Sequence, residues 1–262
     1  MKPRIVVYVF PGTNSEDETK RALDAVGLDA QLVPSNETGA SARDADGYVL
    51  SGGFAYEDRV RAGAIAAHDR AMDVVIDAAE RGKPVLGICN GAQILLEAGL
   101  VPGDGTVRHP TAAFAPNIPG GRFRCVHTYI RLSVPPSRSP LLAALPSDAV
   151  IPAWCAHAEG RLAASPEELK KIRDDGYLAF VYSTAAGDVR EDAIPNGSAL
   201  GAAGLLNKAG NVLAVMPHPE RDAWAFMQHR EGAQPPRAAS EALKPSGGIA
   251  LFKSFAKAFG HG

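Results

Sequence analysis

A cysteine stands between two glycines at the point where a predicted buried strand passes into a predicted helix. In GICNGAQ, residues 87–93, Cys89 has Gly87 two residues before it and Gly91 two residues after it. A nucleophile on a sharp strand-to-helix turn needs small neighbours at these positions, because the backbone folds back tightly around the exposed side chain. The spacing therefore predicts that Cys89 is a nucleophile.

The same turn predicts which groups would assist the cysteine. At the start of a helix, unpaired N–H groups and the helix dipole favour a thiolate. The backbone N–H of Asn90 would then face the oxyanion that forms when Cys89 attacks a carbonyl. We expect a second N–H donor from Gly52 or Gly53, which directly follow another predicted strand.

A cysteine nucleophile needs a base, and a histidine base needs a carboxylate that fixes its tautomer. Two H-x-E patterns offer this pair, His218 with Glu220 and His157 with Glu159. Spacing alone leaves both open. His218 is favoured because it follows a run typical of a buried parallel strand and has a proline on each side, which would hold the imidazole in place. For His157, a substrate-pocket residue and a hydrogen-bonded structural histidine remain alternatives.

The other cysteines and the chain's start give weaker signals. Cys125 and Cys155 lie in apolar strand patterns without flanking glycines, which predicts packing in the core. An odd number of cysteines without metal-type spacing argues against a disulfide framework and favours the cytoplasm. The first apolar run ends at Pro11, so we expect neither a signal peptide nor a membrane span.

Composition excludes some classes of partner. The chain has 262 residues, of which 46% are hydrophobic and 21% charged, with a net charge of −2. These values are ordinary for a soluble globular enzyme and give no electrostatic reason to expect nucleic acid or membrane as a partner.

Short β-branched runs alternate with amphipathic helical patterns over the first hundred residues. This alternation predicts an α/β fold with a flavodoxin-like, open, mostly parallel sheet and helices on both faces. Later runs are longer and predict some antiparallel additions. The strands are expected in 4–10, 30–34, 46–53, 83–89, 122–134, 148–160 and 211–217, and the helices in 14–27, 64–82, 165–176 and 249–259.

Local signals predict where some elements begin and end. Ser15 and Glu18 form a capping-box pattern, and Gly27 suits the end of that helix. In the helix expected at 64–82, Ile65 and Met72 would share one buried face. We expect residues 1–262 to form one domain, with 228–248 as a long surface loop rich in proline, alanine and glycine.

Four motifs in this order, GGFAYEDRVRAGAIA, GICNGAQ, AHAEG and MPHPER, resemble those of the triad-type class I glutamine amidotransferases. More narrowly, the chain resembles the glutaminase subunit of phosphoribosylformylglycinamidine synthase over almost its whole length. The resemblance implies Cys89 as nucleophile, His218 as general base and acid and Glu220 as orienting carboxylate, with Gln93 near the bound glutamine. L-Glutamine would then yield ammonia and a glutamyl thioester, which water would convert to glutamate.

The resemblance also implies partners. In that family the ammonia passes to a synthetase subunit that uses ATP and formylglycinamide ribonucleotide in purine synthesis, and a small third subunit is expected in the complex. The chain lacks a G-x-x-x-x-G-K-[ST] loop, so ATP and Mg²⁺ are expected on the synthetase and no cofactor or metal in this chain. The sequence differs from the family's usual pattern at Glu57 and Ala158, where glycine is usual, and at Ala92, where a larger aromatic residue is usual.

Three other readings share some of these residues. A class I glutaminase could serve a different synthetase with the same three catalytic side chains. A cysteine hydrolase could use a similar sheet, although its histidine usually follows the elbow cysteine closely, whereas here Asn90 and Gly91 follow. An amidotransferase-like regulator without activity usually lacks one of the three catalytic residues.

Overall fold

The structure is a computed structural model that describes residues 1–103, 107–227 and 239–260. Nine strands form one sheet in the order β2-β1-β3-β4-β11-β10-β9-β6-β7, and β5 pairs with β8 in a separate antiparallel ribbon. The strands are β1 (Arg4–Val9), β2 (Asp29–Pro34), β3 (Gly47–Leu50), β4 (Val85–Ile88), β5 (Ala112–Pro116), β6 (Arg124–Leu132), β7 (Val150–His157), β8 (Glu159–Ala164), β9 (Leu178–Ser183), β10 (Ala202–Leu206) and β11 (Val212–Val215).

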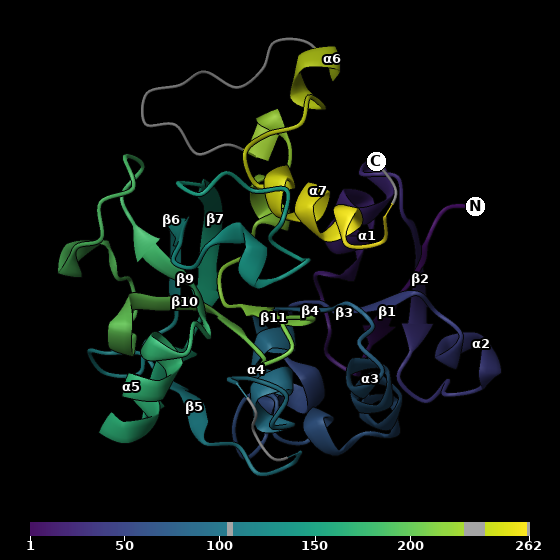
Figure 1. Cartoon of the computed structure of the whole chain (residues 1–262), viewed down its shortest axis with the longest axis horizontal. Coiled ribbons are helices and arrows are strands. Elements are labelled where there is room, and N and C mark those ends of the chain that lie inside the picture. The colour runs from purple at the N-terminus through teal and green to yellow at the C-terminus, as the bar shows by residue number, and fades with distance from the viewer. Residues whose placement is uncertain (104–106, 228–238, 261–262) are drawn as a thin grey trace.

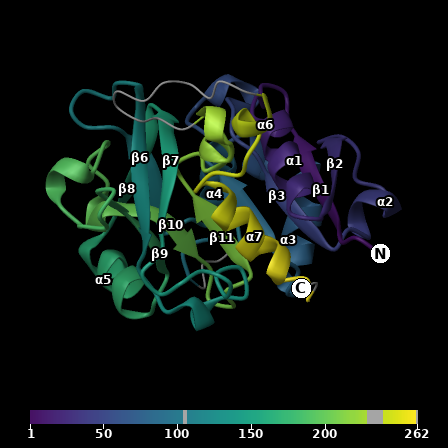
Figure 2. The same cartoon turned by 90° about the horizontal axis from the view of Figure 1, so that it is seen from above.

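The sheet has a parallel part and an antiparallel part. Strands β2, β1, β3, β4 and β11 pair in parallel, whereas β10, β9, β6 and β7 add antiparallel pairs. Seen from above, β6 and β7 of the antiparallel part lie on the opposite side of the molecule from β1 and β2 of the parallel part, with β11 and α4 between them (Figure 2). The mostly parallel sheet with antiparallel additions confirms the predicted fold class.

Helices cover both faces of the parallel strands. Figure 1 shows α1 and α7 on one side of these strands and α3 and α4 on the other. Strands β1, β3, β4 and β11 are buried almost throughout, because both faces are covered. The helices are α1 (Glu16–Ala25), α2 (Ala40–Arg43), α3 (Arg70–Glu80), α4 (Asn90–Glu97), α5 (Pro166–Asp174), α6 (Ala239–Ala242) and α7 (Ile249–Lys257).

The beginning of α1 differs from the prediction. Ser15 stands at the N-cap, but its side chain accepts no hydrogen bond from the helix backbone, so the predicted capping box is wrong. Instead, its hydroxyl accepts a hydrogen bond of 2.7 Å from the guanidinium of Arg221. A tertiary partner has taken the place of the local one. The predicted end is confirmed, since Gly27 has a φ of 91°.

The helix expected at 64–82 is shorter than the sequence pattern indicated. It begins at Arg70, because Asp69 is extended and its carboxylate accepts a hydrogen bond from the N–H of Ala71. Ile65 lies before this cap and is 38% exposed, so its predicted place on the buried helical face is wrong. The spacing of the apolar residues did not reveal that the chain becomes extended at Asp69, before α3.

Two further sequence predictions concern single residues and one segment. Cys155 is buried as predicted, but Cys125 is exposed near the start of β6, so its predicted packing in the core is wrong. Of the predicted loop 228–248, residues 228–238 lie outside the described residues. Its later part contains α6 and a bridge between Trp224 and Pro245.

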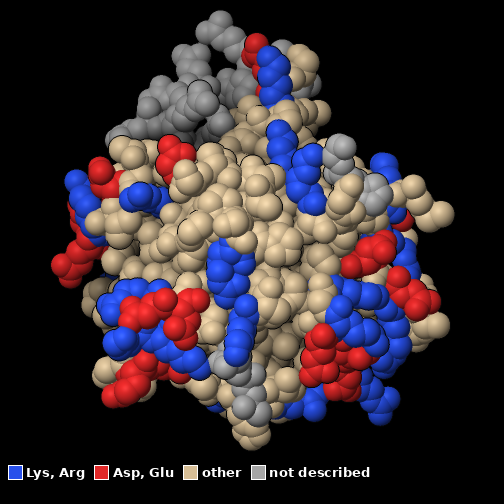
Figure 3. Space-filling model, in the orientation of Figure 1, with Lys and Arg blue, Asp and Glu red and all other residues tan. Residues whose placement is uncertain are grey.

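Acidic and basic side chains are intermixed on the face shown in Figure 3. This mixture agrees with the small net charge of the chain. Within the described ranges, no helix has the length and apolar character needed to cross a membrane.

Candidate active site

Cys89 occupies the turn between β4 and α4 in a strained conformation. Its φ is 52° and its ψ is −107°, a combination that costs on the order of 1–3 kcal/mol for a residue with a side chain. Its N–H donates to the carbonyl of Val215 at 2.8 Å, and its carbonyl accepts from the N–H of Gln93 at 3.0 Å. These contacts hold the turn and the sulfur that it presents.

The glycines on either side of Cys89 are required by close packing. A Cβ added at Gly87 would lie 2.6 Å from the carbonyl oxygen of Gly91, and one at Gly91 would lie 2.0 Å from the carbonyl oxygen of Leu50. Both distances are shorter than a carbon atom allows. The two-residue spacing therefore has the steric cause that the sequence indicated.

His218 comes to this turn from the segment after β11. Its Nδ1 lies 2.5 Å from Oε1 of Glu220, and both side chains are almost fully buried. Glu220 begins a short 3₁₀ turn, Glu220–Asp222. The carboxylate can therefore fix the tautomer of His218.

The surroundings of His218 favour its charged form. Burial alone lowers its pKa, but Cys89 and Glu220 raise it by charge and by side-chain hydrogen bonds, and the balance brings the pKa to about 10. The two neighbours therefore favour the protonated form of His218 over the neutral one. The structure brings together the three side chains that the sequence put forward as nucleophile, base and orienting carboxylate.

The predicted oxyanion donors lie around this group. Asn90 is the first residue of α4, so its N–H has no partner within the helix. Gly52 lies against the imidazole, since a Cβ there would be 2.4 Å from Cε1 of His218. Gly53 pairs with Thr13 in an isolated bridge beside it. Their role as oxyanion donors stays a prediction.

Gln93 joins α4 to β8. Its Nε2 donates to the carbonyl of Glu159 at 2.5 Å, and its Oε1 accepts from Nδ2 of Asn90 at 2.9 Å. The side chain is only 4% exposed. Gln93 thus fixes the protein around the nucleophile, and direct contact with a substrate stays a prediction.

His157 has different surroundings from His218. Its Nε2 lies 3.1 Å from Sγ of Cys155, and its ring packs against Gly160, where a Cβ would come within 2.0 Å of Cε1. Burial, with a smaller contribution from the charge of His218, lowers its pKa to about 3. The carboxylate of Glu159 accepts from the N–H of Ala62. Burial therefore favours the neutral form of His157. Its Nε2 has Cys155 as a partner, but among the described residues its buried Nδ1 has none, and its role stays a prediction.

A small cavity lies beside the nucleophile. It has a volume of about 370 Å³, and its lining includes Trp154, Ala156 and Arg221. The carbonyl oxygen of Ala156 lies 3.7 Å from Sγ of Cys89. Ala156 therefore both lines this cavity and lies beside the sulfur of Cys89.

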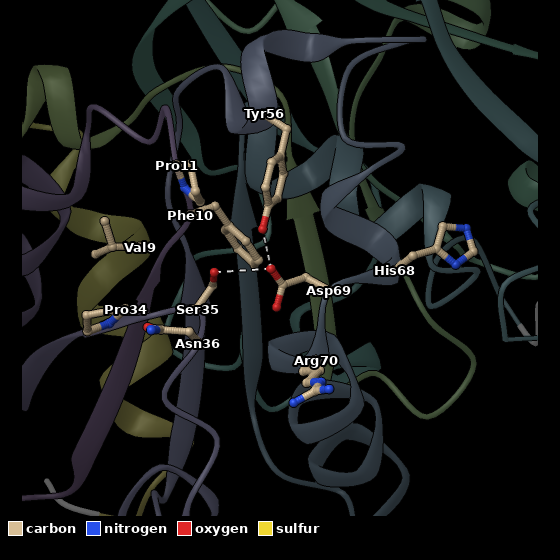
Figure 4. A pocket seen from close by; sticks show the side chains of 10 residues that line it. All are labelled: Val9, Phe10, Pro11, Pro34, Ser35, Asn36, Tyr56, His68, Asp69 and Arg70. Atoms are coloured by element: carbon tan, nitrogen blue, oxygen red, sulfur yellow. Dashed lines mark hydrogen bonds between the residues drawn. The ribbon is translucent and has the colours of Figure 1, made fainter.

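A larger hollow of about 780 Å³ lies at the carboxyl ends of β1 and β2 (Figure 4). Within it, the hydroxyl groups of Tyr56 and Ser35 both donate to one carboxylate oxygen of Asp69, at 2.5 and 3.1 Å. Its lining includes none of the three candidate catalytic side chains. The hydrogen bond from Tyr56 to Asp69 anchors the segment that contains Tyr56.

The sequence did not single out three residues that contact this site. Trp154 and Ala156 lie on β7 and contribute main-chain groups, which sequence type does not reveal. Asp58 accepts a hydrogen bond from Nδ2 of Asn90 at 3.0 Å. Its signal was its place within the GGFAYED motif.

Comparisons with known proteins find relatives over most of the chain. Residues 2–257 match the CobB/CobQ-like glutamine amidotransferase domain. The chain is similar to phosphoribosylformylglycinamidine synthase subunit PurQ of Pyrococcus furiosus, with 42% identity over 87% of this chain and 93% of that protein. The PurQ of Pyrococcus horikoshii is 41% identical over the same shares.

Among solved structures, the chain is similar to a chain in the structure of PurLQS from Thermotoga maritima. The TM-score is 0.75 with 30% identity, and the match covers 99% of this chain and 100% of the other. These findings confirm the resemblance that the four sequence motifs indicated.

Proposed function

The chain belongs to the CobB/CobQ-like glutamine amidotransferase family, and on this premise we propose that it is the glutaminase subunit of a phosphoribosylformylglycinamidine synthase. It hydrolyses L-glutamine to glutamate and ammonia for purine biosynthesis. The observation that carries the assignment of residues is the position of His218, which contacts both Cys89 and Glu220.

The reaction follows from this arrangement. The thiolate of Cys89 attacks the carboxamide carbon of glutamine, and the N–H of Asn90 stabilises the oxyanion. The imidazolium of His218 gives its proton to the departing nitrogen, so that ammonia leaves and a glutamyl thioester remains. His218 then takes a proton from water, which attacks the thioester and releases glutamate. Glu220 holds the imidazole in the required tautomer throughout.

The chain works with a synthetase subunit, to which the ammonia passes. We include in the proposal a small third subunit, as the name PurLQS of the similar structure suggests for that complex. ATP, Mg²⁺ and formylglycinamide ribonucleotide would bind to the synthetase. A cytoplasmic location is also part of the proposal, and the free state of all three cysteines supports it.

Reconstitution tests this function. The full chain is mixed with the synthetase subunit, with and without the small subunit, and formation of formylglycinamidine ribonucleotide is followed with glutamine or with ammonia. We expect glutamine-dependent synthesis that Cys89→Ala abolishes, whereas ammonia-dependent synthesis persists. Activity only with a different synthetase would contradict the proposed partner, and glutamine-dependent synthesis by the Cys89→Ala variant would contradict the mechanism.

A further inference from the structure

The segment Ala55–Asp58 is bound to the residue that follows the nucleophile. The side chain of Asn90 is 1% exposed. Its Oδ1 accepts from the N–H of Ala55 at 2.9 Å, and its Nδ2 donates to the carboxylate of Asp58 at 3.0 Å. The first and last residues of this segment therefore bind the oxygen and the nitrogen of the Asn90 side-chain amide.

These two contacts fix the direction of the amide. A carboxylate accepts hydrogen bonds only, and a backbone N–H donates only. Asp58 therefore requires the NH₂ group of Asn90 on its side, and Ala55 requires the oxygen on the other. The remaining N–H of this group donates to Oε1 of Gln93, whose own NH₂ group donates to the carbonyl of Glu159. The NH₂ group of Asn90 thus donates both to Asp58 and to Gln93, and Gln93 extends this network from the first turn of α4 to β8.

The conformation of the segment is strained. Tyr56, Glu57 and Asp58 have φ values of 55°, 60° and 51°, and such left-handed conformations cost on the order of 1–2 kcal/mol per residue. Contacts from outside must hold the segment. Asn90 does so on one side, and on the other Tyr56 donates to Asp69 within the hollow of Figure 4.

The two acidic residues of the segment have different surroundings. The side chain of Glu57 is 76% exposed and pairs with the exposed Arg59. Asp58 lies partly buried, and burial raises its pKa to about 6, with the charge of Glu159 acting in the same direction and the hydrogen bond from Asn90 opposing both. A carboxylate held in such a place at neutral pH has a specific partner, which is Asn90.

We propose that Asp58 is a positioning residue, which acts through the side chain of Asn90 to hold the first turn of α4, and with it the Asn90 N–H, against the carbonyl that Cys89 attacks. The inference rests on the proposed glutaminase function. Oxyanion donors act only when their geometry is set before the reaction, and small displacements are costly. Asp58 itself touches neither the substrate nor the reacting atoms.

The test compares variants of the full chain with its synthetase, measuring kcat and KM for glutamine hydrolysis. We expect Asp58→Ala to lower kcat roughly 10- to 100-fold with KM changed less than about threefold, because transition-state contacts are lost and ground-state contacts remain. Asp58→Asn keeps an acceptor oxygen and should restore most of the rate. Glu57→Ala, in the same strained segment, should keep the wild-type values.

A double-mutant cycle with Asn90→Ala tests the route. If Asp58 acts through Asn90, Asp58→Ala should add no further loss when Asn90 is already alanine. Additive losses, an equal kcat in Asp58→Ala and wild type, or a rise in KM without a fall in kcat would each overturn the role. If the wild type is active while one of these results is obtained, only the role of Asp58 is overturned, and the proposed glutaminase function is not. A wild type inactive with the synthetase would overturn both.

Discussion

The main chains of Trp154 and His218 exchange two hydrogen bonds, of 2.8 Å from His218 N–H and of 3.1 Å from Trp154 N–H. This bridge joins the segment after β11 to β7, the strand that also offers the Ala156 carbonyl to Cys89. The imidazole is therefore placed by the antiparallel part of the sheet, whereas the nucleophile belongs to the parallel part. The candidate active site lies where the two parts meet.

Glu220→Gln should lower kcat for glutamine hydrolysis by about 10²- to 10⁴-fold with little change in KM. The amide of glutamine can donate to Nδ1 of His218 and so stabilise the wrong tautomer, and it removes a charge that raises the pKa of His218. Steady-state kinetics of the complex with the synthetase measure the effect.

The matched control is Glu159→Gln, in the other H-x-E pattern. Its side-chain oxygen can still accept from the N–H of Ala62, so we expect a rate within about threefold of wild type. If Glu159→Gln were the more damaging of the two substitutions, the assignment of the orienting carboxylate to Glu220 would be wrong.

The nucleophile turn could be predicted from sequence because its requirements are local. The backbone of the turn approaches its own neighbours at Gly87 and Gly91, so the residue types there report the geometry directly. The alternation also located the strands of the parallel part, whereas β5, β9 and β10 in the antiparallel additions were not predicted. Spacing alone left both histidines open, and each imidazole has a partner two residues away, Glu220 for His218 and Cys155 for His157. His218 was favoured by its flanking strand pattern and prolines, and the structure adds its contact with Cys89 from a distant segment.

Features imposed by distant contacts could not be predicted. Nothing in the types of Tyr56, Glu57 and Asp58 indicates three successive left-handed residues, which persist through contacts with Asn90 and Asp69. Ser15 has the sequence of a helix cap but binds Arg221. In both cases a tertiary partner overrides the local preference.

Gly91→Ala should destabilise the protein by about 3 kcal/mol, because the new methyl group would meet the carbonyl oxygen of Leu50 at 2.0 Å. The two nearest atoms, the carbonyl oxygen and carbonyl carbon of Leu50, belong to the backbone, so a rotamer change cannot relieve the clash. Urea unfolding measures the loss. Gly39→Ala is the control, since a Cβ there meets no atom within 4 Å, and it should change the stability by less than about 0.5 kcal/mol. Equal stabilities of the two variants would contradict the steric account.

Glu57→Gly should stabilise the protein by about 0.5–1 kcal/mol. Glycine adopts the φ of 60° found at this position without strain, and this gain exceeds the extra chain entropy that glycine loses on folding. Glu57→Ala removes the same exposed ion pair with Arg59 but keeps the Cβ, and it should leave the stability within about 0.5 kcal/mol of wild type. Unfolding in urea distinguishes the two, and an equal effect of both variants would show that the strain is not the cause.

His157→Gln should make the stability less sensitive to acid. In the folded protein burial lowers the pKa of His157 to about 3, whereas the unfolded chain has the ordinary value of 6.5. Between these values the unfolded state binds the proton and the folded state does not, so stability falls as the pH falls, by up to about 1.4 kcal/mol per pH unit. Above pH 6.5 the residue is neutral in both states and contributes no pH dependence. Urea unfolding at a series of pH values gives the slope of the unfolding free energy against pH for the wild type and the variant. A loss of packing against Gly160 would lower the variant's stability equally at every pH and would leave this slope unchanged. His109→Gln, at an exposed position, controls for the removal of a histidine. An unchanged slope in His157→Gln would show that His157 carries its proton in the folded state, and a charged imidazole would then have to be accommodated beside Cys155.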